Sequence, residues 1–128
     1  MQGMFAGQLL LVGLGGFIGS SLRFALSVGV QKLVPLSLFP YGTMTVNVLG
    51  CLCIGYLGGL LEIRQALDTG MVLFLMIGIL GGFTTFSTYA FETLTLAQNG
   101  MFLKAGMNVV LQVILGLGAA WFGFQLVR

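Results

Sequence analysis

The segment from Gly81 to Glu92 carries the side chains in this sequence that are best suited to chemistry. It reads GGFTTFSTYAFE, so two glycines are followed by hydroxyl groups, aromatic rings and one carboxylate. Phe86 and Tyr89 are three residues apart and fall on one side of a helix. The edge of an aromatic ring is the positive part of its quadrupole, and hydroxyl groups donate hydrogen bonds. Together such groups can replace water around a small anion without a fixed cation.

Further uncharged donors occur elsewhere in the chain, and Asn108 and Gln112 among them share the i, i+4 spacing of one helix face. A full positive charge would hold an anion too tightly for conduction, so neutral donors suit an ion path. A single amide or hydroxyl inside a membrane more often only holds helices together, at about 1 kcal/mol. The joint pattern therefore carries the interpretation, and its candidate members are Thr43, Asn47, Ser87, Thr88, Asn108 and Gln112.

Two charged residues lie inside apolar stretches, where charge is costly. Arg23 follows the glycine-rich stretch GLGGFIGSSL, and we expect it to make a structural pairing with backbone carbonyls or with an acid from another helix. Glu92 fits three roles from the sequence alone, namely a pairing partner, a proton-sensitive gate or a charge at a helix end.

The composition indicates that lipid, and not water, surrounds most of this chain. Hydrophobic residues make up 58% of the 128 and charged residues only 6%, whereas soluble domains carry roughly 25% charged residues. A net charge of +2 is too weak for a nucleic-acid surface. The chain has no His, and its acids are only Glu62, Asp68 and Glu92, so no acid/base pair or usual metal site is expected and no enzyme is indicated.

A membrane-spanning helix needs about 20 mostly apolar residues, and the sequence offers four such runs. The fold expected is a single all-α integral membrane domain over residues 1–128, with no nucleic-acid partner and the lipid bilayer as its surroundings. Short loops make neighbouring helices antiparallel. The predicted spans cover about 4–30, 41–61, 69–97 and 101–127.

The third span is expected to break near its middle, because glycines followed by hydroxyl and aromatic residues make a poor helix there. Irregular backbone at membrane depth persists only where it is buried in protein or lines a cavity. Freed carbonyls at such a break can coordinate a cation. The candidate carbonyl donors are Gly81 and Thr84.

The charged loop residues give almost no orientation signal. Arg64 and Arg128 fall on one side of the membrane, and Lys32 and Lys104 fall on the other. A chain with so little bias is expected to insert both ways, and two copies can then pair as an antiparallel dimer. Small residues four apart allow helices to approach closely, either between subunits or within one. These pairs are Gly15/Gly19, Gly55/Gly59 and Gly78/Gly82.

Three segments together resemble the Fluc family of small bacterial fluoride channels, and the resemblance covers essentially the whole chain. They are GGFIGSSLR at 15–23, YGTMTVN at 41–47 and GGFTTFSTYAFE at 81–92. The resemblance implies a dual-topology antiparallel homodimer in the bacterial inner membrane. It further implies two passive pores that export the fluoride ion, and a central structural sodium ion at the dimer interface.

The same resemblance assigns roles to single residues. Sodium would be held by the carbonyls of Gly81 and Thr84 from each subunit, and Asn47 would orient the site. Phe86 would be the first ring of a fluoride-facing pair whose second ring, usually Phe, is Tyr89 here. The other assignments are track hydroxyls at Thr43, Ser87 and Thr88, a vestibule carboxylate at Glu92, and the first-helix arginine at Arg23; Asn108 and Gln112 fall at more variable positions.

Two other functions stay open at this stage. A proton-coupled dual-topology exporter of organic cations needs an embedded carboxylate at its substrate site, and the first span has none. A non-conducting assembly subunit would use its polar residues only to join helices. Fluoride transport in vesicles separates the channel from both alternatives.

Overall fold

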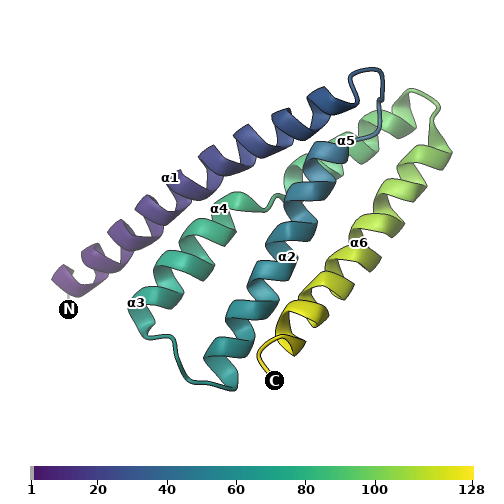
Figure 1. Cartoon of the computed structure of the whole chain (residues 1–128). Helices are drawn as coiled ribbons and strands as arrows, with labels where there is room; N and C mark the ends of the chain where they lie inside the picture. Colours follow the sequence, from purple (N-terminus) through teal and green to yellow (C-terminus); the bar gives the residue numbers. More distant parts are fainter. Residues whose placement is uncertain (1) are drawn as a thin grey trace.

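The computed structural model describes residues 2–128, and within them every regular element is helical (Figure 1). Four segments are long and apolar enough to cross a membrane, as predicted: Gly3–Leu33, Tyr41–Glu62, Thr69–Gln98 and Phe102–Gln125. The chain is therefore a multi-pass, all-helical membrane protein. Its elements are α1 (Gln2–Leu33), α2 (Tyr41–Glu62), α3 (Thr69–Met71), η1 (Val72–Leu80), α4 (Gly81–Phe83), α5 (Phe86–Gln98) and α6 (Phe102–Gln125).

The helix ends differ slightly from the predicted ones. The first helix continues through Gln31 and Lys32, which the sequence places in a loop, and ends two residues before Pro35. The residue before a proline is disfavoured in helical conformation, so the helix stops there. Between α5 and α6 the turn is made by Gly100, whose φ of 74° suits glycine.

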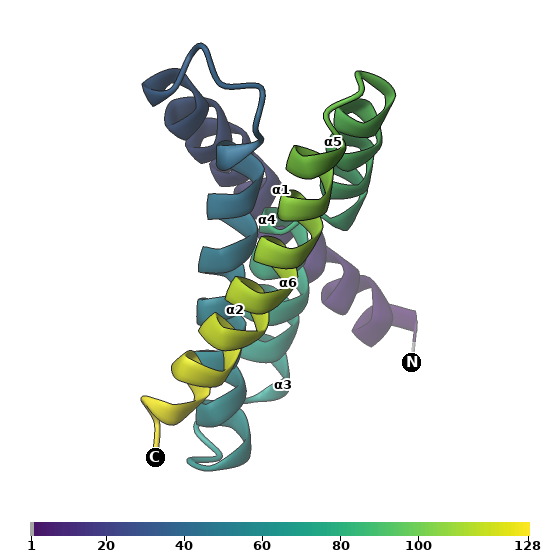
Figure 2. The same ribbon diagram turned by 90° about the vertical axis from the view of Figure 1, so that its right-hand side faces the viewer.

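The four spans run antiparallel, as the short loops predict. Figure 1 shows both termini and the turn after α2 at one end, and the other two turns at the opposite end. The most extensive contact joins α2 to α6, and α1 packs mainly on η1 and α4. In Figure 2 the N-terminal end of α1 points away from the α2–α6 pair.

Glycines allow these close contacts within one subunit. A Cβ added at Gly55 would overlap the carbonyl oxygen of Ala120, and one at Gly123 would overlap that of Leu52. On the other side of the bundle, Gly19 lies directly against the carbonyl of Ile79. At these positions the small residues pack helices inside the subunit, which is one of the two uses expected of them.

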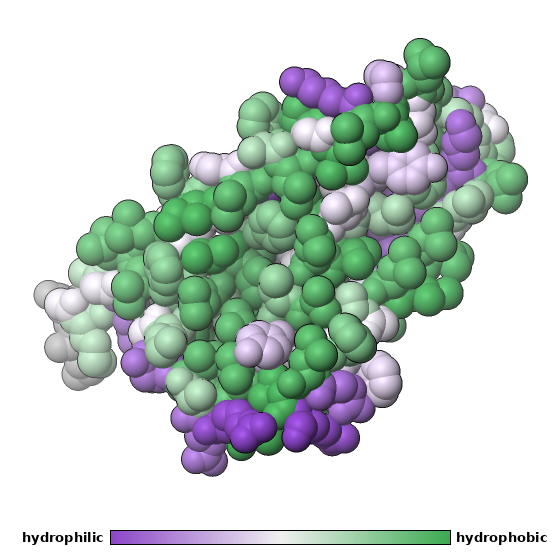
Figure 3. Space-filling view, viewed as in Figure 1, coloured by the Kyte–Doolittle hydropathy of each residue, from purple (hydrophilic) through white to green (hydrophobic). Residues whose placement is uncertain are grey.

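Most of the surface is apolar. Large side chains such as Phe17, Leu117 and Trp121 are exposed, and the largest fully buried side chains are only Val46 and Asn108. Figure 3 shows apolar side chains over most of the visible face and hydrophilic ones gathered towards the ends. Such an apolar surface needs lipid or another protein surface to cover it.

Candidate functional site

The third span breaks at Thr84 and Thr85, close to its middle. Both residues are extended, with ψ values of 156° and 112°, between α4 and α5. In a continuous helix the Thr85 N–H would bond to the carbonyl of Gly81, but here it donates to Asn47 Oδ1 at 2.8 Å. The predicted break is therefore confirmed, and it frees the Gly81 carbonyl from helical pairing.

Asn47 holds the break at two points. Its Oδ1 accepts the Thr85 N–H, and its Nδ2 donates to the Thr85 carbonyl at 3.1 Å. The same Nδ2 also donates to Gln112 Oε1 at 2.8 Å. One amide hydrogen of Asn47 bonds to Thr85 and the other to Gln112, so Asn47 links the backbone of the break to α6.

Thr85 also caps the following helix. Its Oγ1 accepts the Thr88 N–H at 3.2 Å and donates to Thr88 Oγ1 at 3.0 Å, with Ser87 Oγ 3.4 Å away. A threonine cap of this kind sets where a helix begins and how it is rotated. The first turn of α5 is thus fixed by the same residue that Asn47 holds.

This first turn presents the two aromatic rings together. The ring centroids of Phe86 and Tyr89 lie 5.4 Å apart, with 52° between their planes. Phe86 is 79% exposed, so its ring edge is open to a neighbouring ion or chain. A cavity of about 480 Å³ lies beside them at the break, and among its lining residues are Asn47, Gly81, Thr84, Phe86, Tyr89 and Gln112.

Two amide side chains of α6 are connected to this site through Asn47. Gln112 Nε2 donates to Asn108 Oδ1 at 3.0 Å, and Asn108 Nδ2 donates to Thr93 Oγ1 at 2.8 Å. Asn108 has no exposed surface and lines none of the three cavities described here. Thr93 was not singled out from the sequence, although its position four residues after Tyr89 places it on the same face of α5.

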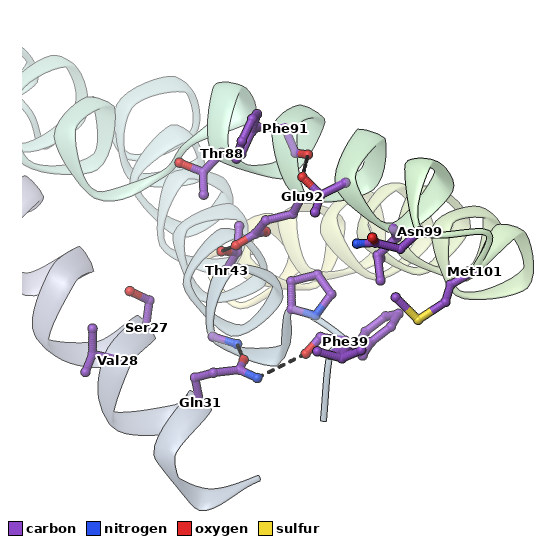
Figure 4. A pocket seen from close by; sticks show the side chains of 15 residues that line it. Ser27, Val28, Gln31, Phe39, Thr43, Thr88, Phe91, Glu92, Asn99 and Met101 are labelled. Carbon is purple, nitrogen blue, oxygen red and sulfur yellow. Dashed lines mark hydrogen bonds between the residues drawn. The ribbon is translucent and has the colours of Figure 1, made fainter. Parts of the chain in front are cut away.

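A second cavity, of about 440 Å³, lies nearer one end of the bundle and contains Glu92 (Figure 4). Thr43 Oγ1 donates to Glu92 Oε1 at 2.7 Å. The other carboxylate oxygen is buried and has no hydrogen-bond partner among the described residues. The Thr43–Glu92 pair is therefore separate from the cavity that holds the aromatic pair.

A third cavity, of about 270 Å³, lies between α1, α2 and the break, and it contains Arg23, Thr43 and Thr88. The Arg23 Nη1 atom lies 3.5 Å from the Thr84 carbonyl oxygen, a long hydrogen bond to the backbone of the break. Ser20 and Ser27 line the same cavity and add hydroxyls that sequence reasoning missed. Ser87 is exposed and lines none of the three cavities.

Gln31 fastens the loop beside the Glu92 cavity, and it too was missed because the sequence placed it outside a helix. Its Nε2 donates to the carbonyls of Ser37 and Phe39, at 3.1 and 3.2 Å, and its Oε1 accepts the Gly42 N–H at 3.2 Å. Figure 4 shows Gln31 and Phe39 on one wall of this cavity. One side chain therefore joins α1, the loop and the start of α2.

Replacing Gln31 with Leu should remove all three bonds and lower stability by about 2 kcal/mol, since each net hydrogen bond contributes about 1 kcal/mol or less at a partly exposed site. Gln31→Glu should be intermediate, because its carboxylate accepts from Gly42 but cannot donate to the two carbonyls. The midpoint of thermal unfolding in detergent measures both. An unchanged midpoint in Gln31→Leu would mean that the loop holds without this side chain.

The donor set is suited to handling an ion without covalent chemistry. Hydroxyls, amides and ring edges surround the break, with one guanidinium and one carboxylate in separate cavities. Among residues 2–128 no three His, Cys, Asp or Glu side chains come together as a metal site.

Known proteins resemble this chain along most of its length. The model of the family described as CrcB-like protein, Camphor Resistance (CrcB), matches residues 10–124. A protein of Methylobacillus flagellatus named fluoride-specific ion channel FluC is 43% identical over 121 residues, covering 94% of each chain. Its namesake from Elusimicrobium minutum is 44% identical over 118 residues, covering 92% of this chain and 91% of the relative.

A third protein of that name, from Nitratidesulfovibrio vulgaris, is 42% identical over 116 residues and covers 91% of this chain and 93% of its own. The match extends through all four spans, the break and the α6 amides. This chain therefore belongs to the CrcB family.

Proposed function

We propose that this chain is a passive, fluoride-selective ion channel that lets fluoride leave the cytoplasm down its electrochemical gradient. Fluoride enters cells from acidic surroundings as the neutral acid and is trapped inside as the anion, so its export needs no energy source. Relatives over 40% identical along nine-tenths of the chain carry the name of such a channel. The residues at the break supply neutral donors beside a cavity.

The observation that carries this proposal is the placement of Phe86 and Tyr89. Their ring centroids lie 5.4 Å apart beside a cavity at a helix break, and Thr85, the residue before Phe86, is fixed by the Asn47 amide. Ring edges and hydroxyls attract an anion weakly enough to release it, which conduction requires. A fixed cation in the same place would bind fluoride without passing it on.

The working unit we propose is an antiparallel homodimer with two pores, in the bacterial inner membrane. Two bases at each end of the bundle leave no preferred orientation, so both insertions are expected. The exposed Phe86 ring and the open cavity at the break leave room for a second copy to complete the site. In an isologous dimer each contact between the two copies occurs twice, which would give two equivalent sites.

We further propose that a structural sodium ion lies between the two copies, held by the carbonyls of Gly81 and Thr84. The Gly81 carbonyl is released from helical pairing, and the residue is exposed beside the cavity. Among residues 2–128 the Thr84 carbonyl accepts only the long bond from Arg23, and a carbonyl oxygen has a second lone pair. When bound, sodium would neutralise the carbonyl ends of two half-helices and join the subunits.

Purified protein in liposomes loaded with potassium fluoride tests the channel. Adding a potassium ionophore should release fluoride rapidly, and the same vesicles loaded with chloride should stay closed. Vesicles without protein are the control. Fluoride retention equal to that of empty vesicles would reject the channel, and exchange of organic cations for protons would point to an exporter instead.

A further inference from the structure

Four polar side chains form a continuous hydrogen-bonded chain behind the aromatic pair. It begins at the Thr85 N–H, passes through the amides of Asn47, Gln112 and Asn108, and reaches Thr93. Thr93 Oγ1 then donates to the Tyr89 carbonyl at 2.8 Å. The chain therefore leaves α5 at its N-cap, returns to α5 at Thr93, and ends on the Tyr89 carbonyl.

The backbone fixes the direction of this chain. The Thr85 N–H can only donate, so Asn47 must turn its oxygen towards it and its NH₂ group towards Gln112. Each following amide then accepts with its oxygen and donates with its nitrogen. The chain closes because the Tyr89 carbonyl can only accept, and the Thr93 hydroxyl supplies the last hydrogen.

The two ends of the chain bracket the aromatic pair. Thr85 directly precedes Phe86, and the Tyr89 carbonyl belongs to the residue that carries the second ring. The middle of the chain is anchored on α2 and α6 through side chains 65 residues apart in sequence. Its bonds therefore resist rotation of α5 relative to these two helices, and such a rotation would move both ring edges.

We propose that Gln112 and Asn108 are positioning residues that act on the ring pair through Asn47 and Thr93. This inference rests on the fluoride-channel function proposed above. Asn108 is fully buried, so a passing ion cannot reach it. Gln112 lines the cavity at the break and keeps a second amide hydrogen. Experiment must therefore distinguish a positioning role for Gln112 from direct contact with the ion.

A double-mutant cycle between Gln112→Met and Asn108→Leu distinguishes the positioning role of Gln112 from a role as an ion ligand. Both changes remove the amide and leave an apolar side chain of similar length. Each single variant removes two bonds of the chain and so interrupts it, and we expect this interruption to slow fluoride efflux about tenfold. The double variant should also lose about tenfold, because a chain already broken cannot be broken again. Gln125→Met, on the same helix but outside the chain, should leave efflux unchanged.

The alternative role of Gln112 gives a different pattern. If it were an ion ligand, Gln112→Met would slow efflux while Asn108→Leu stayed within about twofold of the original rate, which would overturn the inference. Losses that multiply to about a hundredfold in the double variant would overturn it too. Should Asn108→Leu fail to fold, the isosteric Thr93→Val breaks the chain at its far end and takes its place in the cycle.

Hydrogen exchange supplies a readout that does not depend on transport. Gln112→Met should speed exchange of the Thr85 amide about tenfold, because Asn47 loses one of its anchors, while amides near Gln125 stay unchanged. An unaltered Thr85 exchange rate would reject the positioning role. If the original protein passed no fluoride, the proposed function would fail, but this measurement would still decide whether the chain holds the break.

Discussion

Replacing Phe86 with Ile should lower the fluoride efflux rate at least about a hundredfold while the protein stays folded. The ring is 79% exposed in the single chain, so isoleucine sacrifices little packing within the subunit. What it removes is the positive ring edge, which an aliphatic side chain lacks. Removing one such stabilising group from an ion or oxyanion site costs about 10²–10³ in rate.

The matched control is Phe102→Ile. Phe102 is 73% exposed at the start of α6 and lines none of the three cavities. Its substitution should leave efflux within about twofold of the original, measured with a fluoride electrode in the same liposomes. Retained fluoride flux in Phe86→Ile, with an elution profile like that of the original protein, would remove the ring pair from the mechanism.

Much of the fold is predictable from the sequence because lipid allows few solutions. Apolar runs of the length needed to cross a bilayer leave only helices possible, and short loops leave only antiparallel neighbours. The break is predictable as well, since Gly81 and the hydroxyl residues after it favour no continuous helix. Its exact position depends on a contact from α2: the break falls at Thr84 and Thr85, where Asn47 accepts a hydrogen bond from the Thr85 N–H.

The π-helix η1 was not predictable. Its sequence, VLFLMIGIL, is apolar on every side, so no polar periodicity distinguishes 3.6 residues per turn from a wider spacing. The segment packs closely against the backbone of α1, because a Cβ added at Gly78 would lie 2.9 Å from the Cα of Gly15. A π-helix inside a span often accompanies a functional site, and here it leads directly into α4 and the break.

The grouping of the site residues was only partly accessible. The i, i+3 spacing places Phe86 beside Tyr89, and the i, i+4 spacing places Asn108 beside Gln112. The contact between Asn47 and Gln112 joins residues 65 apart, and no local pattern reports it. Local spacing therefore predicts which rings and which amides are neighbours, while the division between ring pair, amide chain and Glu92 cavity comes only from the tertiary structure.

The closeness of α1 to the third span should make Gly19 intolerant of any side chain. A Cβ at this position would overlap the Ile79 carbonyl oxygen and lie 2.9 Å from the Phe83 nitrogen. Both atoms belong to backbone, which cannot move aside as a flexible side chain can. Overpacking typically costs about 1–3 kcal/mol and occasionally more, so Gly19→Ala should lose about 3 kcal/mol of stability.

The same substitution should also impair transport, because Ile79 and Phe83 lie just before the break and Arg23 lies one helical turn after Gly19 on α1. Pushing α1 outwards would pull the Arg23 guanidinium away from the Thr84 carbonyl and loosen the break, which Asn47 also holds. Gly118→Ala on α6 is the matched control, since a Cβ there meets nothing within 4 Å. It should leave stability unchanged or raise it by about 1 kcal/mol through better helix propensity. The thermal midpoint in detergent and fluoride efflux should both fall for Gly19→Ala alone, and equal midpoints for the two variants would show that α1 can shift without cost to the fold.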